Sequence, residues 1–182
     1  MSHIVLLSGS PSTQSRSNAL IDHIRERLEA TGIKTLSFGV RDFPAEDLIL
    51  ANFASPAFVP LVQAIASSAG IVVATPVYKA AYSGSLKTIL DLLPQTALRG
   101  KTVLPLATGG SPAHQLAIDY ALKPVLSALG ATDLLQGVYA VDAQFTKSGT
   151  SFEIAPEILE RLDQGIDRLA SLVPLAGPEA AA

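Results

Sequence analysis

Residues 71–87 read IVVATPVYKAAYSGSLK, and this stretch sets the pattern that the rest of the chain follows. The continuous apolar run Ile71–Val73 is typical of a parallel strand covered by helices on both faces. The run stops at Thr75, and nine residues, Pro76 to Gly84, precede the next helical pattern. A buried strand with such an open end indicates a doubly wound α/β sheet, in which ligands bind beyond the carboxyl ends of the strands.

The rest of the chain repeats this alternation of short β-branched runs and longer amphipathic segments, as expected of βαβ units. The first and third runs are continuously apolar and should be central, whereas the more polar second run suits an edge. Pro105 removes a ladder donor from the fourth run, which predicts either a bulge or a shorter strand. Five strands are predicted: His3–Leu7, Lys34–Phe38, Ile71–Thr75, Thr102–Ala107 and Gly137–Val141.

Five segments have apolar residues at helical spacing, each with one stripe for the sheet. Ser83 or Ser85 is expected to cap the third helix, and the connection from Gly39 to Ser55 is long. The chain is interpreted as one domain over residues 1–173, followed by a disordered tail at 174–182. The predicted helices are Ser17–Ala30, Ala57–Ser68, Ser85–Leu93, Ala113–Leu129 and Pro156–Leu172.

Composition narrows the classes of partner. The net charge is -3 without a run of Lys or Arg, which argues against nucleic acid and membrane surfaces as partners. With 48% hydrophobic and only 16% charged residues, some apolar surface is expected to meet another subunit. No cysteine, signal peptide or apolar run long enough to span a membrane is present, so we expect a cytoplasmic protein.

The loop after the first strand is SGSPSTQSRSN, residues 8–18, and it opens the first helix. Its small hydroxyl residues and Arg16 lie where a helix N-terminus exposes unpaired N–H groups. This predicts a cradle for a monophosphate. The loop matches neither a dinucleotide fingerprint nor a nucleoside triphosphate loop. A loop that only caps the helix is the competing interpretation.

Two further loops should lie at the same edge of the sheet. The backbone of Pro76, Val77, Tyr78 and Lys79 has groups that the sheet cannot all satisfy, so a planar heterocycle could use them. The alternative is that Tyr78 packs and Lys79 is merely solvated. After the fourth strand, Gly109 and Gly110 allow close approach of backbone to a ring.

Side-chain chemistry is sparse. His3, His23 and His114 are far apart and lack metal-ligand spacing, so no metal site is predicted. We find no nucleophile elbow and no pair of carboxylates arranged for acid–base work. The sequence therefore predicts a binding site in which a cofactor carries the reaction.

Three segments in register on this pattern resemble the NAD(P)H-dependent FMN reductases, and most specifically the reductase components of two-component alkanesulfonate monooxygenase systems. The segments are SGSPSTQSRSN, TPVYKAAYSGSLKTILDLLP and LPLATGG, the second followed by AIDYALKPVLSALGA. The resemblance extends from about Ile4 to Leu172. It implies a flavodoxin-like, three-layer αβα fold with a five-stranded parallel sheet in the order 2-1-3-4-5.

The resemblance also implies a site and a reaction. Ser10, Ser15, Arg16 and Ser17 would hold the FMN phosphate, Pro76 to Lys79 would line the isoalloxazine, and Thr108 to Gly110 would close over it. Many relatives have an arginine where this chain has Ser12, which leaves Arg16 as the basic partner. The implied reaction is hydride transfer from NADPH or NADH to FMN. Reduced FMN would go to a monooxygenase, and the protein would be a homodimer or homotetramer.

Pro124 gives the predicted fourth helix an irregularity. It has no N–H, so the carbonyl of Tyr120 loses its partner and the helix must kink or bulge at Asp119–Tyr120. A one-residue π-bulge solves this problem and is frequent at functional sites. Relatives in two-component systems have an inserted tyrosine at a subunit interface, which implies a role for Tyr120 in flavin transfer. A plain proline kink is the alternative.

Two other functions use the same fold. A quinone or azo reductase would retain its FMN, and a flavodoxin-type carrier would transfer electrons without using a nicotinamide nucleotide. Such carriers are usually strongly acidic and shield the flavin with tryptophan, whereas this chain has a net charge of only -3 and no tryptophan. No pair of arginines marks a 2′-phosphate site, so the sequence leaves NADPH and NADH open.

Overall fold

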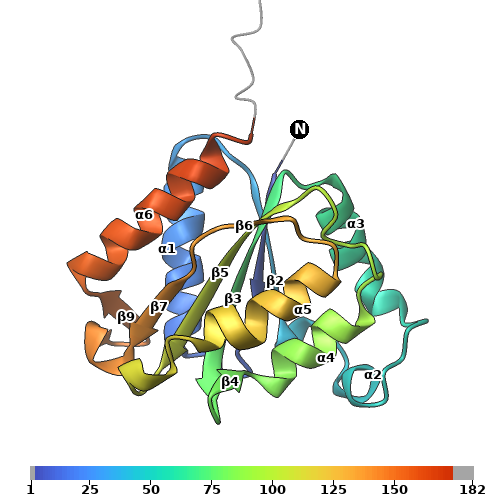
Figure 1. The fold of residues 1–182 in the computed structure, drawn as a ribbon, viewed down its shortest axis with the longest axis horizontal. Helices are drawn as coiled ribbons and strands as arrows, with labels where there is room; N and C mark the ends of the chain where they lie inside the picture. Colours follow the sequence, from blue (N-terminus) through green and yellow to red (C-terminus); the bar gives the residue numbers. More distant parts are fainter. Residues whose placement is uncertain (1–2, 174–182) are drawn as a thin grey trace, which may run out of the picture.

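A computed structural model describes residues 3–173, and within them the central feature is a twisted parallel sheet (Figure 1). The predicted strands are all present, and in space they follow the predicted order, which is the flavodoxin-like one. A short extra strand, β6 (Asp133–Leu134), precedes β7 along the same side of β5. The five principal strands are β1 (Ile4–Ser8), β2 (Thr35–Gly39), β3 (Gly70–Tyr78), β5 (Thr102–Gly109) and β7 (Val138–Val141).

Helices cover both faces of this sheet, giving the predicted three layers (Figure 1). α1 (Arg16–Ala30) and α6 (Pro156–Ala170) lie on one face. On the other lie α3 (Val59–Ser67), α4 (Gly84–Leu92) and α5 (Lys123–Ala128).

Each central strand serves two hydrophobic cores. Because successive side chains point to opposite faces, Ile4 and Leu6 enter the core beneath α1 and α6, whereas Val5 and Leu7 enter the other. All four are fully buried. This explains why the strands are continuously apolar. β2 lies at the edge, as its more polar sequence predicts.

The segment predicted as one helix from Ala113 to Leu129 is divided. A 3₁₀ turn at Pro112–His114 is followed by a π-helical turn at Ile118–Leu122 and then by α5. The π turn surrounds Tyr120, where the missing N–H of Pro124 requires an irregularity. The predicted bulge is therefore confirmed, whereas the predicted start of the helix near Ala113 is wrong, because Pro112–His114 forms a separate 3₁₀ turn.

Both expectations for Pro105 are wrong, because β5 is neither bulged nor short. Pro105 pairs with Val73 of β3 on one side, while its carbonyl faces Gly137 on the other. Opposite Pro105, the segment that pairs with β5 is interrupted, because β6 has ended and β7 has not yet begun. A residue in a strand directs its nitrogen and its carbonyl to the same side, so the missing donor faces this interruption and no ladder bond is lost.

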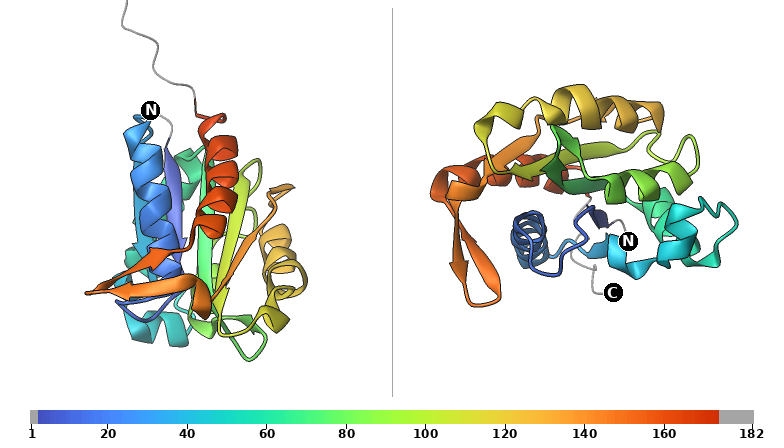
Figure 2. Two further views of the ribbon diagram at one scale, coloured as in Figure 1. Left: turned by 90° about the vertical axis from the view of Figure 1, so that its left-hand side faces the viewer. Right: turned by 90° about the horizontal axis from the view of Figure 1, so that it is seen from below.

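Several elements have no counterpart in the sequence prediction. β4 (Ala81–Tyr82) turns back on the end of β3. α2 (Ala45–Ile49) lies in the long connection between β2 and α3, where Ile49, Leu50 and Phe53 are 76%, 69% and 75% exposed. A two-stranded hairpin of β8 (Phe145–Ser148) and β9 (Ser151–Ile154) projects from the body beside α1 (Figure 2).

Residues 174–182, predicted as a tail, lie outside the described residues. Within residues 3–173, no helix combines the length and the hydropathy that crossing a bilayer requires.

Candidate functional site

The three loops predicted at one edge of the sheet meet around a crevice of about 220 Å³. It lies beyond the carboxyl ends of β1, β3 and β5, where open α/β sheets bind ligands. Ser12, Gln14 and Asp142 also line it, although the sequence did not predict them as site residues. The predicted residues that line it are Ser10, Ser15, Arg16, Ser17, Pro76, Val77, Tyr78, Thr108, Gly109 and Gly110.

The first loop is shaped by its own hydroxyl groups. The Ser15 side chain accepts a hydrogen bond from the Asn18 amide at 3.0 Å and caps α1. Ser10 is buried, and its hydroxyl accepts from the Ser12 amide at 3.3 Å. The Ser17 hydroxyl lies 2.8 Å from that of Thr108, so a buried hydrogen bond joins the start of α1 to the end of β5. The loop thus caps the helix and also forms one wall of the crevice.

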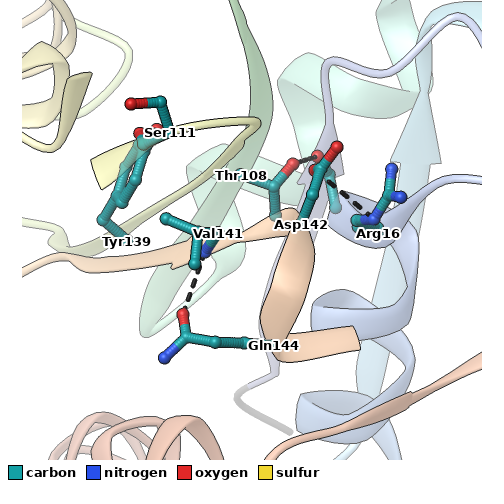
Figure 3. Close-up of polar contacts among 8 residues, drawn as sticks. Arg16, Thr108, Ser111, Tyr139, Val141, Asp142 and Gln144 are labelled. Atoms are coloured by element: carbon teal, nitrogen blue, oxygen red, sulfur yellow. Dashed lines mark hydrogen bonds and ion pairs between the residues drawn. The ribbon is translucent and has the colours of Figure 1, made fainter. Parts of the chain in front are cut away.

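Arg16 is the first residue of α1 and, within residues 3–173, the only cationic side chain that lines the crevice. Its Nε lies 3.4 Å from Oδ1 of Asp142, and its guanidinium is 5.2 Å from the ring centroid of Phe152 in β9. Nε is buried, and among residues 3–173 it has no hydrogen-bond acceptor. Figure 3 shows the carboxylate of Asp142 between Thr108 and Arg16. Arg16 therefore retains an unused donor at the crevice.

The second loop is a tight turn from β3 into β4. Lys79 and Ala80 are its two central residues, with φ of 50° and 65°. Two positive φ values are the pattern of a type I′ hairpin turn, a position where Asn-Gly is favoured and larger side chains are strained. Tyr78 is 53% exposed at the crevice. Lys79 is exposed and does not line the crevice, unlike the other three residues predicted with it.

Buried hydroxyls join the first two loops. The Ser83 hydroxyl donates to the carbonyl of Gly9 at 2.6 Å and accepts from the Leu86 amide at 3.1 Å, so it caps α4. The hydroxyl of Thr75 accepts from the Ser83 amide at 3.0 Å. Ser83 is completely buried. The predicted cap is therefore Ser83 rather than Ser85, and it also fixes the spacing of two crevice walls.

At the third loop, the backbone is packed closely against Tyr139. A Cβ on Gly109 would overlap the Tyr139 hydroxyl, whereas a Cβ on Gly110 would approach only a carboxylate oxygen of Asp142, at 4.0 Å. The Tyr139 hydroxyl donates to the carbonyl of Ser111 at 2.7 Å (Figure 3). Burial raises the pKa of Tyr139, and the charge of Asp142 adds to this increase, so the hydroxyl stays protonated and holds the loop.

Tyr120 lies apart from the crevice lining. It is 79% exposed in the π-helical turn. Asp119 beside it pairs with Lys123 at 2.6 Å. The histidines are also dispersed: His3 contacts the carbonyl of Ala64 at 3.0 Å and His23 lies 3.4 Å from Asp163. Within residues 3–173, no group of three or more His, Asp or Glu side chains is arranged to hold a metal ion.

The sequence prediction missed two contacts of the Arg16 side chain, those with Asp142 and Phe152. Both lie more than 120 positions from Arg16, and nothing in a single sequence indicates such a pairing. A signal for the hairpin that carries Phe152 was present, because Gly149-Thr150 separates two short β runs.

The lining fits the phosphate ester and the ring of FMN. Small hydroxyls, a helix N-terminus and a guanidinium with an unused donor suit a phosphate. The close packing at Gly109 and the main chain at Pro76–Tyr78 provide a wall without Asp, Glu, Lys or Arg side chains, which suits a ring.

Fold and crevice together define a flavodoxin-like α/β protein whose crevice, at the ends of the central strands, has a lining suited to a mononucleotide. A family model described as NADPH-dependent FMN reductase matches residues 2–146, and the chain belongs to this family of oxidoreductases.

Individual relatives agree with this assignment. An FMN reductase (NADPH) of Pseudomonas putida is 49% identical over 166 residues, which cover 90% of this chain and 84% of the relative. That of Escherichia coli is 48% identical over 164 residues, covering 90% of this chain and 86% of the relative. The crystal structure of an apo NADH:FMN oxidoreductase superimposes with a TM-score of 0.84 at 36% identity, covering 98% of this chain and 92% of the other.

Proposed function

We propose that the protein catalyses the NAD(P)H-dependent reduction of FMN and supplies the reduced flavin to a partner monooxygenase that acts on alkanesulfonates. One observation carries the reductase function. Ten residues predicted from three separate loops line a single crevice whose donors suit a flavin mononucleotide. The relatives named FMN reductase (NADPH) support the same conclusion. Both NADPH and NADH remain candidates for the reductant, since the similar crystal structure is of an NADH:FMN oxidoreductase.

The residues of this chain have separable tasks in the proposal. Arg16 and the hydroxyls of Ser10, Ser15 and Ser17 would bind the phosphate, while the main chain of Pro76–Tyr78 would orient the ring. Thr108, Gly109 and Gly110 close its other side. FMN, when bound, supplies the hydride-accepting chemistry. The protein's contribution is orientation, because among the described residues that line the crevice only Tyr78 and the Arg16–Asp142 pair have ionisable side chains.

Delivery to a second enzyme gives Tyr120 a role. We propose that Tyr120 lies at an interface between subunits and influences flavin transfer. Two observations support this proposal: Tyr120 lies in a π-helical turn, a feature frequent at functional sites, and its side chain is exposed. The exposed Ile49, Leu50 and Phe53 support association into a homodimer or homotetramer, since several large apolar side chains exposed in one short segment favour burial against a second copy.

A single assay tests the reductase function. NADPH or NADH oxidation is followed with FMN, FAD, riboflavin and a quinone as acceptors, and flavin content is measured after desalting. Turnover of free FMN with little retained flavin is the expected result. Retained FMN with turnover of the quinone alone would favour the quinone reductase, and no oxidation with any acceptor would contradict the proposal.

Deleting Tyr120 tests the interface. We expect a changed oligomeric state in light scattering and an altered rate of flavin release. A matched control, Leu116→Ala, removes another exposed apolar side chain that precedes the π turn. Unchanged assembly and release in the Tyr120 deletion would contradict the role of this residue.

A further inference from the structure

We propose that Asp142 competes with the flavin phosphate for Arg16, and that this competition keeps FMN binding weak enough for the flavin to be released. The inference rests on the proposed function and assigns a specific residue to the balance between retaining and delivering FMN. It follows from three features of the crevice: its charge, the geometry of the Arg16–Asp142 pair and the absence of another task for the carboxylate.

The charge of the crevice is balanced. Of the residues that line it, only Arg16 and Asp142 are formally charged, so their charges cancel. A phosphate monoester carries a charge of about -1.5 to -2 at neutral pH. Binding it beside Arg16 therefore places it against a fixed negative charge. A site built only for tight retention of phosphate would not include that carboxylate.

The contact between the two residues is one that a phosphate can replace. The 3.4 Å approach of Asp142 Oδ1 to Arg16 Nε is an ion pair but not a hydrogen bond. The two side chains are 36% and 46% exposed, and ion pairs with this exposure contribute little to stability. Phosphate oxygens bind guanidinium groups more strongly than a poorly aligned carboxylate does, because they can accept well-aligned, charge-assisted hydrogen bonds.

Asp142 has no other contact that explains its position. Among residues 3–173, its carboxylate forms no hydrogen bond with a side chain or with the backbone, and Arg16 is its ion-pair partner. Its backbone begins a 3₁₀ turn, Asp142–Gln144, directly after β7. The end of β7 thus places Asp142 in the lining of the crevice, and Figure 3 shows its carboxylate beside Arg16. Replacing the carboxylate should leave the fold intact.

Phe152 also contacts the arginine. Its ring lies 5.2 Å from the guanidinium carbon, in the hairpin that projects beside α1. Cation–π contact restricts the arginine without using any N–H donor. Arg16 is therefore positioned by Phe152 and neutralised by Asp142, and only the second contact opposes a phosphate.

The test compares the apoprotein with Asp142→Asn, which removes the charge at nearly constant size. Dissociation constants for FMN and riboflavin are measured by flavin fluorescence, and that for inorganic phosphate by calorimetry. We expect Asp142→Asn to lower the dissociation constant for FMN at least about fivefold at low salt, because the negative charge beside the phosphate-binding guanidinium is removed. Riboflavin, which lacks the phosphate, should bind equally to both proteins.

Matched variants separate local from general charge effects. Asp142→Glu keeps the charge and should behave like the wild type. Asp91→Asn removes the same charge from an exposed pair with Lys87 outside the crevice lining, and should leave FMN binding unchanged. The gain in Asp142→Asn should shrink in high salt, since salt screens exposed charges. Equal melting temperatures would show that the variants are folded.

The outcomes are distinguishable from failure of the reductase proposal. Wild-type protein that neither binds FMN nor oxidises NAD(P)H would contradict the proposed function, while the phosphate titration would still test Asp142. The role of Asp142 is wrong if Asp142→Asn binds neither FMN nor phosphate more tightly than the wild type. It is also wrong if riboflavin gains as much affinity as FMN.

Discussion

The loop after β1 and the turn after β3 border the same crevice but are held in different ways. Side-chain hydrogen bonds fix the first: Ser15 caps α1, and Ser17 bonds to Thr108. The second is fixed by its backbone, which reverses at Lys79 and Ala80 with positive φ at both residues. The residues that define the first loop can therefore be recognised by type. The second loop places main-chain groups, and its side chains are freer to vary.

This difference predicts opposite responses to mutation. In the first loop, removing a hydroxyl should lower the free energy of unfolding and alter the conformation of the loop, because a buried hydrogen-bond partner is left unsatisfied. In the second, removing a side chain should cost little, and a residue better suited to positive φ should stabilise the protein. Ser83 belongs to neither class, because it joins the two loops through Gly9.

The largest effect is expected from Ser83→Ala, which breaks the connection between the loops. The change removes the cap of α4 and leaves the buried Gly9 carbonyl without its donor. We expect the free energy of unfolding to fall by about 2–3 kcal/mol. Urea denaturation measures it, with Ser85→Ala as the matched control, since Ser85 does not cap the helix. Equal losses in the two variants would show that Ser83 does not join the loops.

Local sequence patterns correctly predicted most strands of the sheet and many of the residues that line the crevice. The strands could be predicted because burial on both faces makes them continuously apolar, as at Ile4–Leu7 and Ile71–Val73. The π turn could be predicted because the effect of Pro124 on a helix is local. The proximity of Ser10, Ser17 and Thr108 could be predicted because the carboxyl ends of parallel strands lie at one edge of the sheet.

What the sequence did not reveal depends on contacts between distant segments. Arg16 meets Asp142 and Phe152 only because β7 and the hairpin pass the start of α1, and no residue pattern encodes that approach. The error at Pro105 has the same origin. The sheet tolerates this proline because of the gap between β6 and β7. That gap belongs to the adjacent segment of the sheet rather than to the sequence TVLPLAT itself.

A smaller effect is expected from Ser17→Ala in the first loop. The change leaves the buried Thr108 hydroxyl without its partner across the crevice. We expect a loss of about 1–2 kcal/mol in the free energy of unfolding, together with weaker FMN binding. In the double variant Ser17→Ala with Thr108→Val, both polar partners are gone, so the loss should be smaller than in Ser17→Ala alone. A larger loss in the double variant would contradict the hydrogen bond as the cause.

The smallest effect, and the one of opposite sign, is expected from Ala80→Gly in the second loop. Ala80 has a φ of 65°, which strains any residue with a Cβ. Glycine relieves this strain but makes the unfolded chain more flexible, so we expect a gain of only about 0.5–1 kcal/mol in the free energy of unfolding. Ala81→Gly, in β4 beside the turn, is the control and should destabilise, because glycine weakens a strand. If FMN affinity is unchanged in Ala80→Gly, the main chain at Pro76–Tyr78 keeps its position without the strain. If affinity falls while stability rises, the strained turn itself positions the backbone for the flavin.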